Sequence, residues 1–188
     1  MDAFLISTAV IFIAELGDKS QLMALTFATR FKTVPVLIGI TVATAIVHAF
    51  SVGVGAALGA TIPTRPVTIV AAIAFIGFGL WTLRGDELTD QDKARAAAVP
   101  NRHAIMAVGT VFFLAELGDK TMLATITLAT KEGLFGTWAG STVGMVAADA
   151  LAIVVGRQLG TRLPERTIKI GAATAFFAFA AILLVEAL

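Results

Sequence analysis

The chain has 188 residues, of which 57% are hydrophobic and only 14% are charged, and its mean hydropathy is +0.90. A water-soluble domain of this length could not bury so much apolar surface, so the composition excludes a soluble protein and indicates one whose solvent is lipid. The net charge of +1 excludes a strongly basic nucleic-acid-binding surface, and the absence of cysteine excludes a disulfide framework and a thiolate metal site.

Six stretches are apolar and long enough to cross a bilayer as helices, for which about 20 residues suffice. In chain order, the predicted spans are residues 3–28, 34–60, 66–84, 103–129, 134–160 and 168–187. The one long polar stretch separates the third span from the fourth and is expected to be a flexible linker. The predicted fold class is therefore an all-α integral membrane protein with six transmembrane helices.

The second half of the chain repeats the first. Residues 4–87 align without a gap on residues 105–188, and 29 of the 84 aligned pairs are identical. Each half has three predicted spans, an odd number, so the second half must enter the membrane from the opposite side. Such inverted repeats are typical of secondary transporters, whose site lies between the repeats at mid-membrane. We predict a first three-helix repeat over 1–84, a linker over 85–102 and a second, inverted three-helix repeat over 103–188.

The distribution of basic residues predicts the orientation, because loops rich in lysine and arginine stay in the cytoplasm. One side carries ten of them, namely Arg30, Lys32, Arg84, Lys93, Arg95, Arg102, Arg157, Arg162, Arg166 and Lys169. The other side carries Arg65 and Lys131. This bias places the central linker in the cytoplasm and both termini outside.

Two acidic motifs lie at equivalent positions near the middle of the first and fourth predicted spans. They read Glu15-Leu16-Gly17-Asp18-Lys19-Ser20 and Glu116-Leu117-Gly118-Asp119-Lys120-Thr121. Because residues three apart share one face of a helix, the two acids of each motif are expected to point the same way. Inverted symmetry would bring the two acid pairs toward a common axis. The glycine within each motif permits either close helix packing or local unwinding that frees backbone carbonyls.

These buried charges predict metal–proton exchange. A charge at the bilayer centre costs roughly 3 kcal/mol, so the motif groups must be paired, protonated, hydrated or bound to a cation. The four acids carry −4 and the two lysines +2, so one divalent cation brings the sum to zero. Protons can replace that ion, because carboxylates clustered in a poor solvent bind protons more readily.

Oxygen donors of this kind suit magnesium, calcium and manganese. The predicted metal ligands are Glu15, Asp18, Glu116 and Asp119, with further oxygens from Ser20, Thr121 and Gln21. Met122 occupies the position equivalent to Gln21, and its thioether favours manganese over calcium. Lys19 and Lys120 are interpreted as charge-balancing groups. The alternative is that each lysine pairs within its own helix with the glutamate four residues earlier.

A second pair of polar residues lies deep in predicted spans. The internal repeat aligns Asp149 in the fifth span with His48 in the second. Both residues are costly inside lipid. The pair is interpreted either as a proton relay or outer ligand, since histidine titrates near neutral pH, or as a polar contact that bridges the two halves.

The duplicated Glu-x-Gly-Asp-Lys-(Ser/Thr) motif resembles that of the GDT family of cation/proton exchangers, which includes manganese exporters and manganese/calcium transporters. The resemblance covers essentially the whole chain. It implies that Glu15, Asp18, Glu116 and Asp119 bind the cation and that protons drive its export. It also implies auxiliary roles for the hydroxyl residues that end each motif.

Other functions fit the sequence less well. A proton-independent cation channel or uniporter would also place acids in a pore, but inverted repeats favour alternating access. An exporter of small organic solutes should show apolar walls at its site. An enzyme is not expected, because only two histidines occur and the His-Glu-x-x-His pattern is missing. We expect no permanently bound cofactor and no nucleic acid; the expected partners are transported Mn²⁺ or Ca²⁺, protons and the lipid bilayer, with the protein a monomer or homodimer.

Overall fold

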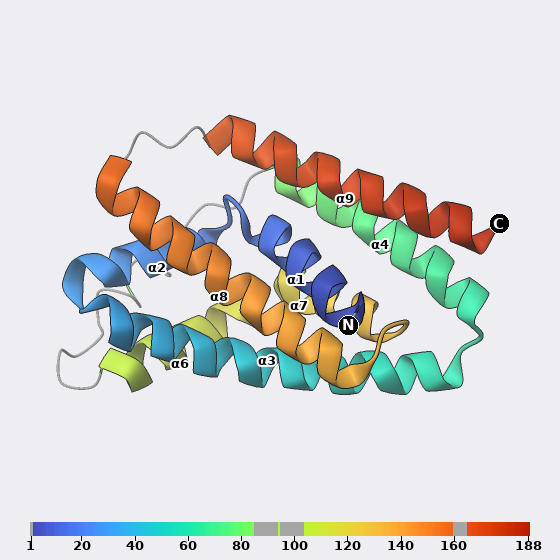
Figure 1. Ribbon diagram of the computed structural model, residues 1–188, viewed down its shortest axis with the longest axis horizontal. Coiled ribbons are helices and arrows are strands. Elements are labelled where there is room, and N and C mark those ends of the chain that lie inside the picture. Colours follow the sequence, from blue (N-terminus) through green and yellow to red (C-terminus); the bar gives the residue numbers. More distant parts are fainter. Residues whose placement is uncertain (1, 85–93, 95–103, 160–164) are drawn as a thin grey trace.

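The computed structural model describes residues 2–84, 94, 104–159 and 165–188, and the regular elements in these ranges are helices (Figure 1). Most of the predicted linker, 85–102, lies outside the described residues. In chain order the helices are α1 (Asp2–Glu15), α2 (Lys19–Arg30), α3 (Thr33–Thr61), α4 (Thr64–Arg84), α6 (Ala104–Glu116), α7 (Lys120–Ala129), α8 (Leu134–Leu159) and α9 (Glu165–Ala187).

Four of these helices are long and apolar enough to cross a membrane, and they coincide with four of the predicted spans. They are α3, α4, α8 and α9; α6 is a shorter apolar helix. The predicted spans 3–28 and 103–129 each contain two helices, α1 with α2 and α6 with α7, with a break at the acidic motif. The motif glycines allowed for such a break, but the sequence did not decide between local unwinding and close helix packing.

Small residues allow the central helices to pack closely. A Cβ atom at Gly55 of α3 would lie 2.3 Å from the carbonyl oxygen of Ile126 in α7, and one at Gly140 of α8 would lie 2.3 Å from that of Phe4 in α1. Real Cβ atoms do not approach a carbonyl so closely, so only glycine permits these contacts. The indole of Trp138 in α8 also donates a hydrogen bond of 2.9 Å to a carbonyl of α3. These contacts hold the broken helices against α3 and α8.

Helices α4 and α9 pack along each other and form a separate pair beside this core (Figure 1). Aromatic rings join them: the ring centroid of Phe75 in α4 lies 4.8 Å from that of Phe179 and 5.9 Å from that of Phe176, both in α9. Phe75 and Phe176 are buried. The pair therefore has an apolar interface of its own, which favours its behaving as one unit.

The molecule has two distinguishable ends along its long axis. The C-terminus and the α3–α4 turn lie at one end, here called the terminal end, and the α7–α8 loop and the N-terminus lie in the same half of the molecule, farther in (Figure 1). The α2–α3 turn, the start of α6 and the end of α8 lie at the other, called the linker end. Beside the core, the α4–α9 pair packs on α1 and α7, the two short helices that extend from the motifs toward the terminal end.

Candidate cation site

Each acidic motif forms an unwound turn between two helices. Helix α1 ends at Glu15 and α2 begins at Lys19, with Gly17 between them at φ 75°. In the second half, α6 ends at Glu116, and Gly118 has φ 81°. A positive φ is readily adopted only by glycine, so this residue ends one helix and lets the chain start another.

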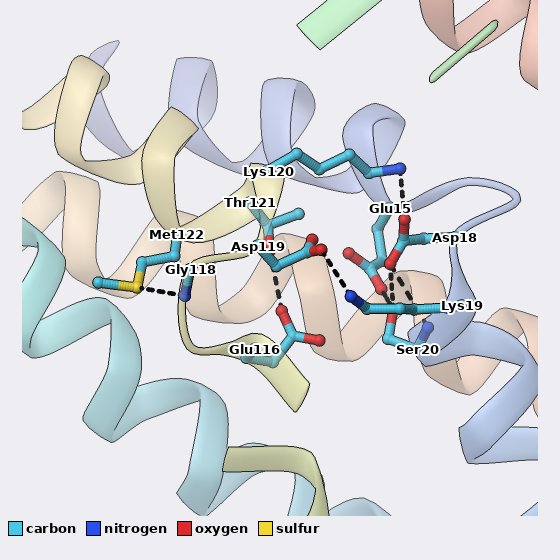
Figure 2. A network of polar contacts seen from close by, with 10 residues as sticks. All are labelled: Glu15, Asp18, Lys19, Ser20, Glu116, Gly118, Asp119, Lys120, Thr121 and Met122. Carbon is cyan, nitrogen blue, oxygen red and sulfur yellow. Dashed lines mark hydrogen bonds and ion pairs between the residues drawn. The ribbon is translucent and has the colours of Figure 1, made fainter. Parts of the chain in front are cut away.

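The breaks change how the acids are presented. Glu15 is the last residue of α1, whereas Asp18 caps the start of α2 and accepts a hydrogen bond of 3.4 Å from the backbone N–H of Ser20. The two acids therefore do not share a face of one helix, but in the first motif they still point the same way, since the hydroxyl of Ser20 contacts both Glu15 and Asp18. The unwinding that the motif glycines permit is confirmed, and it brings acids from a helix end and a helix start together (Figure 2).

All four motif acids are buried, with exposed fractions of 2% or less. The hydroxyl of Thr121 donates to Oε2 of Glu116 at 2.9 Å, and that of Ser20 donates to Oε1 of Glu15. Ser20 Oγ also lies 3.0 Å from Oδ2 of Asp18. In this conformation, the two hydroxyls predicted as auxiliary ligands therefore hold the glutamates in place.

The two motif lysines pair across the halves of the protein. Nζ of Lys19 lies 3.1 Å from Oδ1 of Asp119, and Lys120 forms an ion pair with Asp18 (Figure 2). These two contacts are equivalent under the internal repeat. The alternative of pairing only within each helix is therefore wrong, since the ion pairs connect residues about one hundred positions apart. The lysines thus act as the predicted charge-balancing groups, but each does so for the opposite half.

Gln21 and Met122 occupy equivalent places and fold back on the unwound turns. The amide N–H of Gly17 donates to Oε1 of Gln21 at 2.9 Å, and that of Gly118 lies 3.1 Å from the sulfur of Met122. Gln21 also donates through Nε2 to the carbonyl oxygen of Ala148 in α8 at 3.0 Å. The side chain predicted as a metal ligand therefore also ties the first motif to α8.

Asp149 and His48 are both fully buried, on α8 and α3 respectively. Asp149 lies close enough to Asp18, Glu15 and Glu116 to interact with each electrostatically. The ring of His48 is buried, and no charged group among the described residues acts on it. The structure thus brings Asp149 to the motif acids, but it shows no equivalent interaction for His48.

The acids are close but not yet arranged as a metal cage. Within the part of the chain that the structure describes, no three carboxylate or imidazole groups lie together as one ion would need. The lysines occupy the positions beside two of the acids. Binding of a divalent cation there would favour withdrawal of the lysine ammonium groups or reorientation of the acids, because the ion and an ammonium group repel each other when they contact the same carboxylate.

Both halves of the chain match one known family of transporters. Two segments of the chain, residues 3–90 and 104–188, match the family described as divalent cation/proton antiporter GDT1. The chain belongs to this family. Members of the GDT1 family are transporters and not enzymes, so both the predicted family and the predicted class of function are confirmed.

Relatives from several organisms extend along nearly the whole chain. A protein of Vibrio cholerae named "Putative manganese exporter" is 29% identical over 94% of this chain and 92% of its own length. The GDT1-like protein sll0615 of Synechocystis is 29% identical over 97% of this chain and 96% of its own length. The chloroplastic protein PAM71 of Arabidopsis thaliana is 30% identical over 94% of this chain but only 55% of its own length. No solved structure matches this GDT1 chain.

Proposed function

We propose that this GDT1 protein exports manganese from the cytoplasm in exchange for protons, with the ion bound by Glu15, Asp18, Glu116 and Asp119. The observation that supports this most directly is the burial of these four acids around two lysines that neutralise only half of their charge. A divalent cation supplies the remaining two positive charges. Two protons supply the same charge, which makes the ion and the protons alternative occupants of one site.

Exchange follows from this competition. Carboxylates must be deprotonated to bind a metal, so metal binding releases protons and protonation expels the metal. We propose that the site must remain neutral in the middle of the membrane, so it holds either the metal ion or the protons. Movement of the ion is then coupled to movement of the protons. We propose that Ser20, Thr121 and Gln21 contribute further oxygens once the ion displaces their present partners.

Manganese is favoured over calcium by two observations. The donors are hard oxygens, which suit both ions, but the sulfur of Met122 lies at the second unwound turn and is a softer ligand. The relative from Vibrio cholerae also carries manganese in its name. Calcium is the alternative cargo, since carboxylate sites also bind it.

We propose that the chain crosses the membrane six times as two inverted three-helix repeats. In this arrangement α1 with α2, and α6 with α7, each form one interrupted span, and the four long helices form the others. Interrupted spans at mid-membrane are typical of transporter sites, because the unwound backbone lines a cavity rather than lipid. The excess of basic residues supports an orientation with the linker end in the cytoplasm and the terminal end outside. The bacterial and cyanobacterial relatives support a prokaryotic plasma membrane as the location.

The test is transport by purified protein in liposomes that contain a pH-sensitive dye. An imposed pH gradient should drive Mn²⁺ movement, and that movement should dissipate the gradient. Glu15→Gln should abolish both signals, because it removes a buried acid of the site. Glu186→Gln is the matched control, since Glu186 is exposed at the terminal end, where it pairs with Lys131.

Each contrary result identifies another function. Mn²⁺ flux that leaves the pH gradient unchanged would indicate a channel or uniporter. A protein that moves neither Mn²⁺ nor Ca²⁺ would lead back to export of small organic solutes. Wild-type exchange by Glu15→Gln would show that the metal binds elsewhere.

A further inference from the structure

Asp149 is a buried acid to which the proposed exchange assigns no role. It lies on α8 with an exposed fraction of 0%, and neither of its carboxylate oxygens has a hydrogen-bond partner. A buried carboxylate without a partner is strongly unfavourable. A group of this kind in a membrane indicates a function that compensates for its burial.

The place of Asp149 connects it to the first motif. The residue before it, Ala148, accepts the hydrogen bond from Gln21, and Gln21 in turn accepts the amide hydrogen of Gly17. This chain of contacts fixes α8 against the unwound turn. The carboxylate of Asp149 lies within electrostatic range of Asp18 and of both motif glutamates.

The acids of the cluster differ in what neutralises them. Asp18 and Asp119 are paired with lysines, and Glu15 and Glu116 accept hydrogen bonds from hydroxyls. Asp149 has neither type of partner. The internal repeat gives α3 a histidine at the equivalent place, so this additional negative charge comes from one half only.

We propose that Asp149 is a fifth acidic group of the cation site, and that it supplies a carboxylate ligand from α8 to the divalent ion. This inference rests on the proposed function, because it concerns the same ion. It goes beyond the motif acids, since α8 carries no part of either motif. The unpartnered carboxylate then has a partner whenever the site is loaded. Because five ionised acids would leave the loaded site with one negative charge, one of the other acids keeps a proton when the ion is bound.

Binding of Mn²⁺ to detergent-purified protein tests this directly, because free aqueous Mn²⁺ gives an electron paramagnetic resonance signal that disappears on binding. Asp149→Asn keeps the side-chain shape and removes the charge, and should weaken Mn²⁺ binding about tenfold or more. Asp149→Glu should restore most of the affinity. Thr137→Val is the matched control, since Thr137 is also a buried, unpartnered polar residue of α8, and it should bind as the wild type does.

Affinity of Asp149→Asn within twofold of the wild type would overturn the role of Asp149. Equal losses in the asparagine and glutamate variants would also overturn it, since they would indicate packing rather than charge. If Glu15→Gln abolishes binding while Asp149→Asn retains it, only this inference fails. If the wild-type protein binds no Mn²⁺, the proposed function fails as well.

A second, independent observation concerns the packing of α9 and α4 on the two unwound turns. Ile168 in α9 lies against the first unwound turn, where its Cγ2 would be 3.3 Å from a Cβ atom at Gly17. The repeat-equivalent residues are Val67 in α4 and Gly118 in the second turn. A Cβ atom at Gly118 would meet nothing within 4 Å. Two nearly identical turns are therefore covered differently, although their sequences predict the same contacts.

The same asymmetry extends along the helices. Ala9 of α1 and Ala178 of α9 line one apolar crevice of about 320 Å³, and Val67 of α4 and Ile126 of α7 line another of about 200 Å³. The internal repeat relates α1 to α6, α2 to α7 and α4 to α9. Packing of α1 on α9 therefore corresponds to packing of α6 on α4, and packing of α7 on α4 corresponds to packing of α2 on α9. Those pairs make at most marginal contact in the described ranges. The α4–α9 pair thus covers the terminal-end halves of the broken helices and leaves the linker-end halves uncovered.

We infer that the α4–α9 pair moves as one unit between two positions that the internal repeat relates. In the second position, α4 would pack on α6 and α9 on α2, with the residue pairs of the present contacts exchanged between the halves. The two positions use equivalent residues, so their free energies are similar, as a two-state carrier requires. Under the proposed function, the present position closes the terminal-end side of the site, while the linker-end side lacks this cover and the four motif acids stay buried.

Cysteine cross-linking tests this cleanly, because the chain contains no native cysteine. The pair Ala9→Cys/Ala178→Cys reports the present position. The pair Thr110→Cys/Gly77→Cys, at the repeat-equivalent places, reports the exchanged position. Thr110 is exposed, and a Cβ atom at Gly77 meets nothing within 4 Å, so both substitutions fit. Single-cysteine variants control for cross-links between molecules.

With a short bifunctional thiol reagent, we expect both pairs to cross-link, and we expect Mn²⁺ or a change of pH to shift their yields in opposite directions. Failure of the Thr110/Gly77 pair to react under every condition would overturn the exchanged position. Yields that rise and fall together would show that the helices separate rather than exchange. Both results are independent of whether Mn²⁺ is the transported ion, so they are distinguishable from failure of the proposed function.

Discussion

Lys120 of α7 forms an ion pair with Asp18, the residue that caps α2, and both side chains are at most 2% exposed. The equivalent contact joins Lys19 to Asp119, but the Lys19 side chain is 20% exposed. The two ion pairs are thus related by the repeat and differ in burial. Because removal of one member of a buried pair leaves the other uncompensated, their effects on stability should differ as well.

Lys120→Met should therefore lower the free energy of unfolding by about 3–5 kcal/mol, the typical loss for a broken buried pair. Lys19→Met should lower it by less, because water reaches that side chain. Thermal unfolding in detergent measures both. The double variant Asp18→Asn/Lys120→Met should recover part of the loss, and equal destabilisation by the two single variants would contradict the difference in burial.

The motif glycines should not tolerate side chains. Gly17→Ala and Gly118→Ala each force a positive φ on alanine, which costs roughly 1–2 kcal/mol. Gly17→Ala should be the more harmful, since its Cβ would also press on Ile168, whereas the space beside Gly118 is open. Gly77→Ala in α4 is the control and should be neutral or slightly stabilising. Melting temperatures in that order would support the geometry of both turns.

Helix α3 offers a matched pair of glycines for testing the close contact with α7. Gly55→Ala would place a methyl group 2.3 Å from the carbonyl oxygen of Ile126, so we expect destabilisation of at least about 2 kcal/mol. Gly53→Ala meets nothing within 4 Å and should be tolerated. Size-exclusion profiles and unfolding curves of the two proteins give the comparison, and a stable Gly55→Ala protein would argue against this packing.

Mn²⁺ binding should release protons from the site. Ligand carboxylates must be ionised, so affinity should fall as the pH falls, because protons compete with the metal. Titration of weakly buffered protein with Mn²⁺ should acidify the solution, and Glu116→Gln should reduce the number of protons released. Binding without any proton release would separate the metal site from the proton pathway.

The sequence was sufficient for the long helices and for the acids, because both depend on residue type and local pattern. Hydropathy located α3, α4, α8 and α9, and the duplicated motif located Glu15 and Asp119. It did not decide whether the motif glycines would break the helices or pack against a neighbouring helix, because a positive φ at Gly17 and close packing both require glycine. Pairing of Lys19 with Glu15 and pairing with Asp119 were equally consistent with the sequence, because the second depends on tertiary structure.

The difference in packing over the two motif turns could also not be predicted, and the reason is a different one. Val67 and Ile168 are equivalent residues of similar chemistry, so the sequence predicts equal contacts with Gly118 and Gly17. The structure shows one contact and not the other. Because both halves share the same sequence pattern, the pattern cannot distinguish the two packing arrangements. Only the structure shows which arrangement a given state adopts.

The crossed ion pairs also bear on how such a protein could have arisen. A chain with one repeat would bury its aspartate and its lysine without partners, because each finds its partner in the other half. Two copies inserted in opposite orientations would restore both contacts, so an antiparallel dimer of half-length chains already satisfies the electrostatics. Fusion of the two genes then fixes the opposite orientations. Once the gene was duplicated, the two copies could diverge, so that one has Gln21 and His48 where the other has Met122 and Asp149.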